Sequence, residues 1–537
     1  MLSPSLRLRA GALLIALPWL NPFAAGPSTW AGPWLFSAMC AAFVFATARP
    51  AAPRAGVGLV LGGLAAWGLL RSGLAPETLA LAAACLLVGM MAAAAAGDAK
   101  EGSFARLAGM AWLAAAVVST AAALLQYFGA ADRFEPWIDA SAAGEAFANL
   151  RQRNQFASLT AIGMAVLLCL PPAGRRRWAA VGAMVCVAVG NAATTSRTGL
   201  LELLLLGALI WRWRGLRSRA MQLWLVGLGA YIAGAIGLPL LADGMGLAQS
   251  PLWMRVTGID PCGSRLVLWS NVLHLIAQRP WLGWGWGELD YAHYVTLYPG
   301  PRFCDILDNA HNLPLHLAVE LGVPAAIVVC GAFTWGVWHA RPWNERDPAR
   351  QMAWSVLLVL VVHSLLEYPL WYGPFEIALG LCLGLLWPAS DAGGRRASSW
   401  PAPASGLVSV VVLCAAAYAM WDYRVASQVY LPQEQRSPAW RDDPLARAKG
   451  AWLFRNQVLF AELTLTPLTR NNAEWMFDRA SALLHYSPEP RVIEKLIESA
   501  VLLRRDREAL RQMARFRAAF PQAYADWSAA NRSARPR

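Results

Sequence analysis

The feature that most constrains this sequence is the recurrence of apolar runs of about 18 or more residues, each long enough to cross a bilayer core. Such runs must be helices or strands of a closed barrel, because a bilayer offers a backbone N–H no other partner. Barrel strands alternate polar and apolar residues, and the run from Leu200 to Ile210 does not. Only 15% of the residues are charged, against about 25% in soluble domains. The sequence therefore excludes a cytosolic enzyme, a disordered chain and a collagen-like fibre, and predicts an all-α polytopic membrane protein.

We predict thirteen transmembrane helices, and their direction follows from the placement of Lys and Arg, which favour cytoplasmic loops. With the N-terminus in the cytoplasm, 18 basic residues fall on the inner side and nine on the outer side. Arg7 and Arg9 precede the first apolar run as in a signal peptide, but we interpret that run as an uncleaved anchor. The predicted spans are 10–26, 31–48, 55–72, 75–97, 105–128, 155–172, 177–192, 198–213, 220–242, 313–340, 352–370, 373–389 and 404–422.

This alternation divides the chain into a transmembrane domain, residues 1–422, and an outer tail, residues 423–537. A large outer loop over 243–312 is predicted to take part in catalysis. In the tail, prolines interrupt amphipathic runs, which indicates a soluble helical domain. Phrases ending at Pro488 and Pro521 are 33 residues apart, close to a tetratricopeptide period. A small helical cap and a docking module for an acceptor protein both stay open. We assume a bacterial origin, which makes the outer side the periplasm.

The nine cysteines and the net charge bound the chemistry further. Seven cysteines fall within predicted spans and are simplest as small packing residues. Cys262 and Cys304 share the large outer loop, and because the periplasm is oxidising we predict a disulfide between them. Neither belongs to a CxxC pair, so we predict no metal site and no cofactor. The charge of +13 reflects the basic inner loops, and no clustered basic face indicates a nucleic-acid partner.

Polar residues gather at the predicted outer ends of five separate segments, where ionisable groups are candidates for function. Arginines suit phosphate and pyrophosphate, because their guanidinium groups bind two oxygens at once. A histidine can accept the proton of an attacking hydroxyl. Together these residues fit the transfer of a group whose leaving part is a lipid pyrophosphate. The candidates are Arg151, Gln152, Arg153, Asn154, Gln155, Arg197, Arg265, His311, Glu367 and Tyr368.

Plainer interpretations of these residues stay open. A single histidine at the start of a helix is more often a cap or a packing residue. Arg153 and Arg197 can serve as anchors that reach the lipid headgroups. The tryptophan-rich run Trp281 to Gly287 and the tyrosines that follow it are consistent with interfacial anchoring and, equally, with flat faces for sugar rings.

Part of this pattern resembles bacterial O-antigen ligases and their relatives. His311 is followed after ten residues by Gly322, and Arg197 is followed four positions later by Leu201, as in that superfamily. The stretch from Gly263 to Gly287 is similar to its loop consensus, with Arg265 as the second arginine. The phrases Arg151-Gln152-Arg153-Asn154-Gln155-Phe156-Ala157 and Glu367-Tyr368-Pro369-Leu370-Trp371-Tyr372, with the outer tail, more specifically resemble pilin-type protein O-oligosaccharyltransferases of the PglL type.

The resemblance covers about residues 1–430 and implies a GT-C-like, metal-independent membrane glycosyltransferase. Such enzymes move a preassembled glycan from undecaprenyl pyrophosphate to an acceptor hydroxyl in the periplasm, and in the PglL type to Ser or Thr of a protein such as pilin. By this resemblance His311 is the base or orients the acceptor, and Arg197 and Arg265 bind pyrophosphate. Gln155 and Tyr368 match positions expected to contact a substrate.

Arg153, Asn154 and Glu367 join the predicted substrate-binding residues, and whether Gln152 or Gln155 is the key glutamine stays open. Two other functions also stay open. One is an O-antigen ligase acting on lipid A–core, or a polymerase of repeat units. The other, from a different class, is a transporter or flippase for lipid-linked sugar, which would place ionisable groups near the midplane of the bilayer. We favour the protein O-oligosaccharyltransferase, in the bacterial inner membrane with its active site facing the periplasm.

Overall fold

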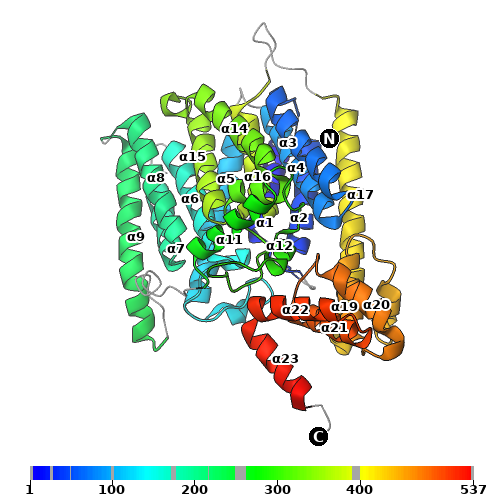
Figure 1. Cartoon of the computed structure of the whole chain (residues 1–537). Coiled ribbons are helices and arrows are strands. Elements are labelled where there is room, and N and C mark those ends of the chain that lie inside the picture. The colour runs from blue at the N-terminus through cyan, green and yellow to red at the C-terminus, as the bar shows by residue number, and fades with distance from the viewer. Residues whose placement is uncertain are drawn as a thin grey trace.

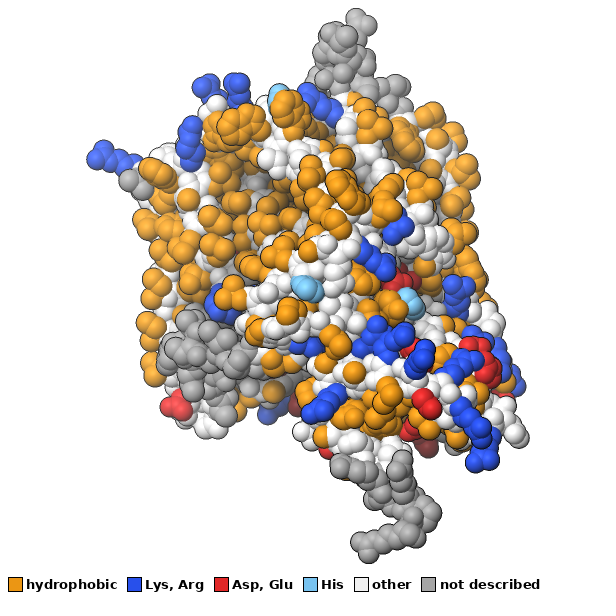
Figure 2. Space-filling model, viewed as in Figure 1, with side chains coloured by type: hydrophobic (Ala, Val, Ile, Leu, Met, Phe, Trp, Pro, Cys, Tyr) orange, Lys and Arg blue, Asp and Glu red, His pale blue; other side chains and the backbone are white. Residues whose placement is uncertain are grey.

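The computed structural model describes residues 4–24, 28–48, 50–97, 102–170, 177–215, 217–247, 262–389 and 400–533. Within these ranges the chain is helical, and an isolated β-bridge pairs Pro53 with Pro388. Long helices pack side by side, and the tail helices gather at the end of this bundle opposite the N-terminus (Figure 1). Hydrophobic side chains cover the flank of the bundle, and Lys and Arg lie at the end away from the tail and again over the tail (Figure 2). The prediction of an all-α polytopic membrane protein is confirmed.

Thirteen helices of the described ranges correspond to the predicted spans. By length and hydropathy, seven of the described helices can cross a membrane, and four other apolar helices are shorter, so the number thirteen stays a prediction. The helices are α1 (Pro4–Leu20), α2 (Ala31–Thr47), α3 (Ala55–Ser72), α4 (Pro76–Ala96), α5 (Ser103–Tyr127), α6 (Arg153–Cys169), α7 (Arg177–Ala193), α8 (Arg197–Arg214), α9 (Arg219–Gly244), α14 (Val323–Ala340), α15 (Pro348–Leu366), α16 (Gly373–Leu386) and α17 (Ala402–Ser427).

The predicted continuous span 313–340 is wrong, because the chain breaks at Gly322 into α13 (Leu313–Leu321) and α14. Gly322 has a left-handed φ of 93°, and a Cβ added there would lie 2.2 Å from the carbonyl oxygen of Trp281. Only glycine tolerates both conditions. The close approach fixes the outer loop against the end of α13. Other boundaries differ by a few residues: α15 ends at Leu366, and α17 runs on to Ser427.

Small residues let the membrane helices approach one another closely, as is usual where no water drives them together. The tightest case is α16 against α4, where Gly380 and Gly384 lie over the carbonyl oxygens of Val88 and Ala92. A Cβ on Gly384 would lie 2.1 Å from the oxygen of Ala92, so the two helices leave no room for a side chain. This contact fixes the position of α16, and α16 follows directly after the segment that carries Glu367.

The outer tail consists of short helices that share their core with the outer loop. Tyr294 of α12 (Leu289–Val295) is 2% exposed within this core, and its hydroxyl donates to Oε1 of Gln512 at 2.7 Å. In Figure 1, α12 accordingly lies beside α22. The tail helices are α18 (Pro444–Ala448), α19 (Arg455–Leu465), α20 (Ala473–Leu483), α21 (Pro490–Leu502), α22 (Asp506–Ala519) and α23 (Pro521–Ser533).

Candidate functional site

Four segments far apart in sequence meet at the carboxylate of Glu367, directly after α15. His311 Nδ1 lies 2.7 Å from Glu367 Oε2, and Asn154 Nδ2 donates to Oε1 at 3.1 Å. The guanidinium of Arg265, the first residue of α11 (Arg265–Gln278), also donates to Oε1. Gln152 Nε2 approaches Oε2 at 3.4 Å. We call Asn154, Arg265, His311 and Glu367 the Glu367 cluster.

The hydrogen bond to Glu367 determines how the His311 ring can react. Because Nδ1 faces a carboxylate, Nδ1 carries the proton and the lone pair of the neutral ring lies on Nε2. No described residue makes a hydrogen bond to Nε2. Burial acts to raise the pKa of Glu367, but the hydrogen bond and charge of His311, followed by the charge of Arg265, outweigh it and hold the pKa below its ordinary value. Glu367 is therefore an anion at neutral pH.

The backbone holds His311 in an uncommon conformation. Its φ is 49°, which non-glycine residues adopt mainly where the surrounding structure enforces it. Its N–H donates to Oδ1 of Asn309 at 2.9 Å, and its ring lies edge-on to Tyr368 with centroids 4.9 Å apart. These contacts and the bond to Glu367 fix both the backbone and the ring.

Because Glu367 has a depressed pKa in the folded state, its interactions stabilise the fold above the unfolded pKa of about 4.3 and are lost as pH falls through the lower folded value. We expect Glu367→Gln to lower the melting temperature in detergent at pH 7. The difference from the parent protein should shrink as the pH falls below 4. A difference that grew on acidification would contradict this account of the carboxylate.

A second buried carboxylate fastens the outer loop to α13. Glu320 is 1% exposed and accepts the backbone N–H groups of Gly287 at 2.9 Å and Leu289 at 3.2 Å. His316 Nε2 lies 3.3 Å from Glu320 Oε2, and the N–H of Ala310 points at His316 Nδ1 at 3.5 Å. The loop, α12 and the backbone next to His311 are thereby tied to one helix.

Glu320→Ala leaves two buried N–H groups without an acceptor, each costing about 1–3 kcal/mol. We expect a clear fall in the melting temperature of the purified protein, and a smaller one for Glu320→Gln, which keeps one acceptor oxygen. Glu434→Ala, at an exposed tail position, is the matched control. Equal melting temperatures for all three variants would show that the Glu320 contacts contribute nothing.

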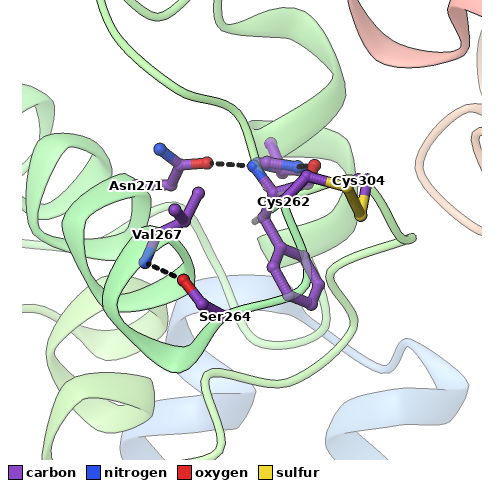
Figure 3. Close-up of a disulfide and its surroundings, with 7 residues drawn as sticks. Cys262, Ser264, Val267, Asn271 and Cys304 are labelled. Carbon is purple, nitrogen blue, oxygen red and sulfur yellow. Dashed lines mark hydrogen bonds between the residues drawn. A yellow bond between two sulfur atoms is a disulfide. The ribbon is translucent and has the colours of Figure 1, made fainter. Parts of the chain in front are cut away.

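The disulfide between Cys262 and Cys304 lies in the same outer loop, with Cα atoms 5.4 Å apart (Figure 3). Ser264 Oγ caps α11 by accepting from the N–H of Val267 at 3.3 Å. Asn271 Oδ1 accepts from the N–H of Phe303 at 2.8 Å. The disulfide therefore links the start of α11, where Arg265 lies, to the loop segment that leads to His311.

The other predicted site residues lie around the cluster. Arg197 is exposed at the start of α8, and its guanidinium has no partner in the part of the chain that is described. Ser196, the residue before Arg197, donates a hydrogen bond from its Oγ to Oδ1 of Asn154 at 2.7 Å. Arg197 therefore directly follows a residue that contacts the Glu367 cluster. Arg153 is instead engaged in an ion pair with Glu145. Gln155 is 1% exposed, and its amide nitrogen has no hydrogen-bond partner among the residues that the structure describes.

A large cavity, of about 1910 Å³, adjoins the cluster. Most of its wall is apolar and comes from α2, α3, α4 and α14 to α17. Its outer end is lined by Asp308 and Asn309 of the loop, by Tyr368 after α15, and by His485 of the tail. Because Asn309 and Tyr368 both contact His311, the outer end of the cavity lies next to the reactive ring.

Three families match this chain. The family described as protein glycosylation ligase matches residues 146–170, the O-antigen ligase family matches 182–330, and the family described as virulence factor membrane-bound polymerase, C-terminal, matches 351–535. These ranges contain every member of the Glu367 cluster. Over these parts of its length the chain is similar to O-antigen ligases and to protein glycosylation ligases.

Two curated proteins that are similar to this chain come from Acinetobacter baylyi. A general O-oligosaccharyltransferase is 31% identical over 126 residues, which are 23% of this chain and 21% of that protein. A ComP-specific O-oligosaccharyltransferase is 23% identical over 254 residues, 45% of this chain and 44% of that protein. The chain thus matches less than half the length of either relative.

Several residues of this site were not identified from the sequence. Asn309 positions the backbone of His311, and Ser196 holds Asn154. His316 lies next to the loop, where its Nδ1 faces the N–H of Ala310. Asn309 lies two residues before His311, and such close spacing of polar residues was the one available signal. Glu367 was predicted as a substrate contact, but its carboxylate is 6% exposed and is occupied by protein side chains.

Proposed function

We propose that this chain transfers a preassembled glycan from undecaprenyl pyrophosphate to a Ser or Thr hydroxyl of a protein such as a pilin. The reaction takes place at the periplasmic face of the bacterial inner membrane. The observation that carries the proposal is that one carboxylate, Glu367, holds His311 and Arg265 together beside a large cavity. The relatives named as O-oligosaccharyltransferases support a protein as the acceptor.

In the proposed reaction, Nε2 of His311 accepts the proton of the acceptor hydroxyl as its oxygen attacks the anomeric carbon. The bond between that carbon and the pyrophosphate oxygen breaks, and undecaprenyl pyrophosphate leaves. Glu367 keeps the His311 ring in the reactive tautomer and stabilises the imidazolium that forms, as the carboxylate of a Ser-His-Asp triad does. Direct attack inverts the configuration of the anomeric centre.

The arginines stabilise the leaving group in this proposal. Arg265 uses one nitrogen for Glu367, and its side chain stays 38% exposed, so other N–H groups are free to bind a phosphate oxygen. Arg197 directly follows a residue that contacts the same cluster, and its exposed guanidinium supplies a second positive charge. Fixed cations that face the developing charge lower the barrier without a metal ion.

The cavity fits the amphipathic shape of the donor. Its long apolar part lies between membrane helices and suits a polyprenyl chain. Its outer end is polar and lies beside His311, where the first sugar is needed. A lipid lying in this cavity places the bond to be broken at the membrane surface, which is where the cluster lies.

The acceptor is tested with purified protein, an undecaprenyl-linked oligosaccharide, and either a pilin or lipid A–core. We expect mass spectrometry to find glycan on the pilin alone. Glycan on lipid A–core alone would favour the O-antigen ligase, and lengthened donor would favour a polymerase. Movement of the donor across proteoliposomes without any covalent product would favour the transporter.

A further inference from the structure

We infer that the tail and the outer loop together form the binding site for the donor glycan, at the outer end of the cavity. This inference rests on the proposed function and extends it, because it gives the tail a part in substrate recognition. The outer end is lined by Trp286, Asp290 and Asp308 of the loop, by Trp371 after α15, and by Gln457 and Tyr486 of the tail.

Two of these residues form an aromatic wall. The rings of Trp286 and Trp371 are stacked, with centroids 5.9 Å apart and planes inclined by 13°. Both lie edge-on to the ring of His316, at 5.3 and 4.8 Å, which fixes their orientation. Flat, polarised aromatic faces bind the C–H faces of sugar rings while leaving the hydroxyl edges free for hydrogen bonds.

Carboxylates at the same end supply acceptors for those hydroxyls. Neither Asp290 nor Asp308 has an ion-pair partner within the described ranges, and a carboxylate accepts two hydrogen bonds side by side. Burial raises the pKa of Asp290 well above its ordinary value, and the nearby charge of Asp308 adds to the rise. Burial raises the pKa of Asp308 as well, so a further negative charge is disfavoured at this end of the cavity. This end therefore suits the uncharged, hydroxyl-rich part of the donor, whereas Arg265 and Arg197 suit the pyrophosphate.

The tail is held in place at this end of the cavity. His485 Nδ1 lies 2.6 Å from Glu288 Oε2, and the ring of His485 stacks on Tyr291 with centroids 3.7 Å apart. Tyr294 is buried in the core of the tail. Tyr486 and Gln457 therefore form a fixed part of the cavity wall.

Covalent continuity of the donor selects the glycan as the occupant. The lipid and the glycan are joined through the pyrophosphate, so a donor with its lipid in the apolar part must extend its glycan outward from His311. The outer end of the same cavity, beside His311, is the part that the loop and the tail line. An acceptor segment needs access only to the anomeric carbon.

The test compares two undecaprenyl pyrophosphate donors, one with a single sugar and one with a trisaccharide, and the variants Gln457→Ala and Asp290→Asn. Binding of each donor to purified protein in nanodiscs is measured, with no acceptor present. We expect each variant to weaken binding of the trisaccharide donor roughly fivefold, the worth of about one hydrogen bond, and to leave the single-sugar donor unchanged. Gln433→Ala and Asp442→Asn, at exposed tail positions outside the cavity wall, are the matched controls.

Equal affinities of the variants and the parent protein for the trisaccharide donor would overturn the inference. So would an increase in KM for the acceptor alone in a transfer assay, since it would assign this surface to the acceptor. Because donor binding is measured without transfer, this outcome is independent of the proposed function, which fails instead if the parent protein binds donor but modifies no protein.

Discussion

Replacing His311 by alanine is expected to lower the rate of glycan transfer by roughly 10²- to 10⁴-fold, the usual contribution of a positioned general base. The variant loses the ring that is hydrogen-bonded to Glu367, and with it the acceptor for the hydroxyl proton. The measurement is the initial rate of glycan attachment to a purified pilin, followed by mass spectrometry. Binding of the lipid-linked donor should change little, because the arginines remain.

The matched control for this prediction is His274→Gln, in the same outer region but outside the cluster. Its ring contacts Tyr298, with centroids 5.4 Å apart. Both variants should elute as the parent protein does in gel filtration and reach the membrane in equal amounts. A folded His311→Ala protein with the parent rate would remove His311 from the reaction.

Replacing Arg265 by lysine is expected to lower kcat by roughly 10- to 100-fold, because an ammonium group cannot hold a carboxylate and two phosphate oxygens in one plane. The charge is retained, so the loss measures the geometry of the guanidinium rather than the field at the site. Arg279→Lys is the matched control, since Arg279 ends the same helix and lies over the ring of Trp284 at 4.0 Å. An unchanged kcat for Arg265→Lys would reduce Arg265 to a lipid anchor.

The sequence predicts the fold class because membrane spans leave a local signal, and the long apolar runs are sufficient to identify it. It also places the ends of the spans, and so it indicates which polar residues share the outer surface. Asn154, His311 and Glu367 lie at such ends, and Arg265 lies in the long outer loop that leads to one of them. The structure brings all four together. No long-range contact had to be known to group them.

What depends on packing was not visible in the sequence. The break at Gly322 lies where the carbonyl of Trp281 leaves no room for a side chain, and no local pattern in α13 reveals that neighbour. Likewise, Arg153 forms an ion pair with Glu145 rather than joining the cluster, and this pairing depends on how the loop before α6 folds. The packing of Tyr294 into the tail core joins two segments more than 200 residues apart, so it cannot be predicted without knowing where both segments lie.

The central claim is that His311 and Glu367 act as a unit, with the carboxylate working only through the ring. The direct test is a double-mutant cycle on transfer rates with His311→Ala, Glu367→Gln and the double variant. We expect Glu367→Gln alone to cost on the order of 10²-fold or more, and to cost nothing further once His311 is absent, because residues that act together are not additive. Costs that multiply in the double variant would contradict the account.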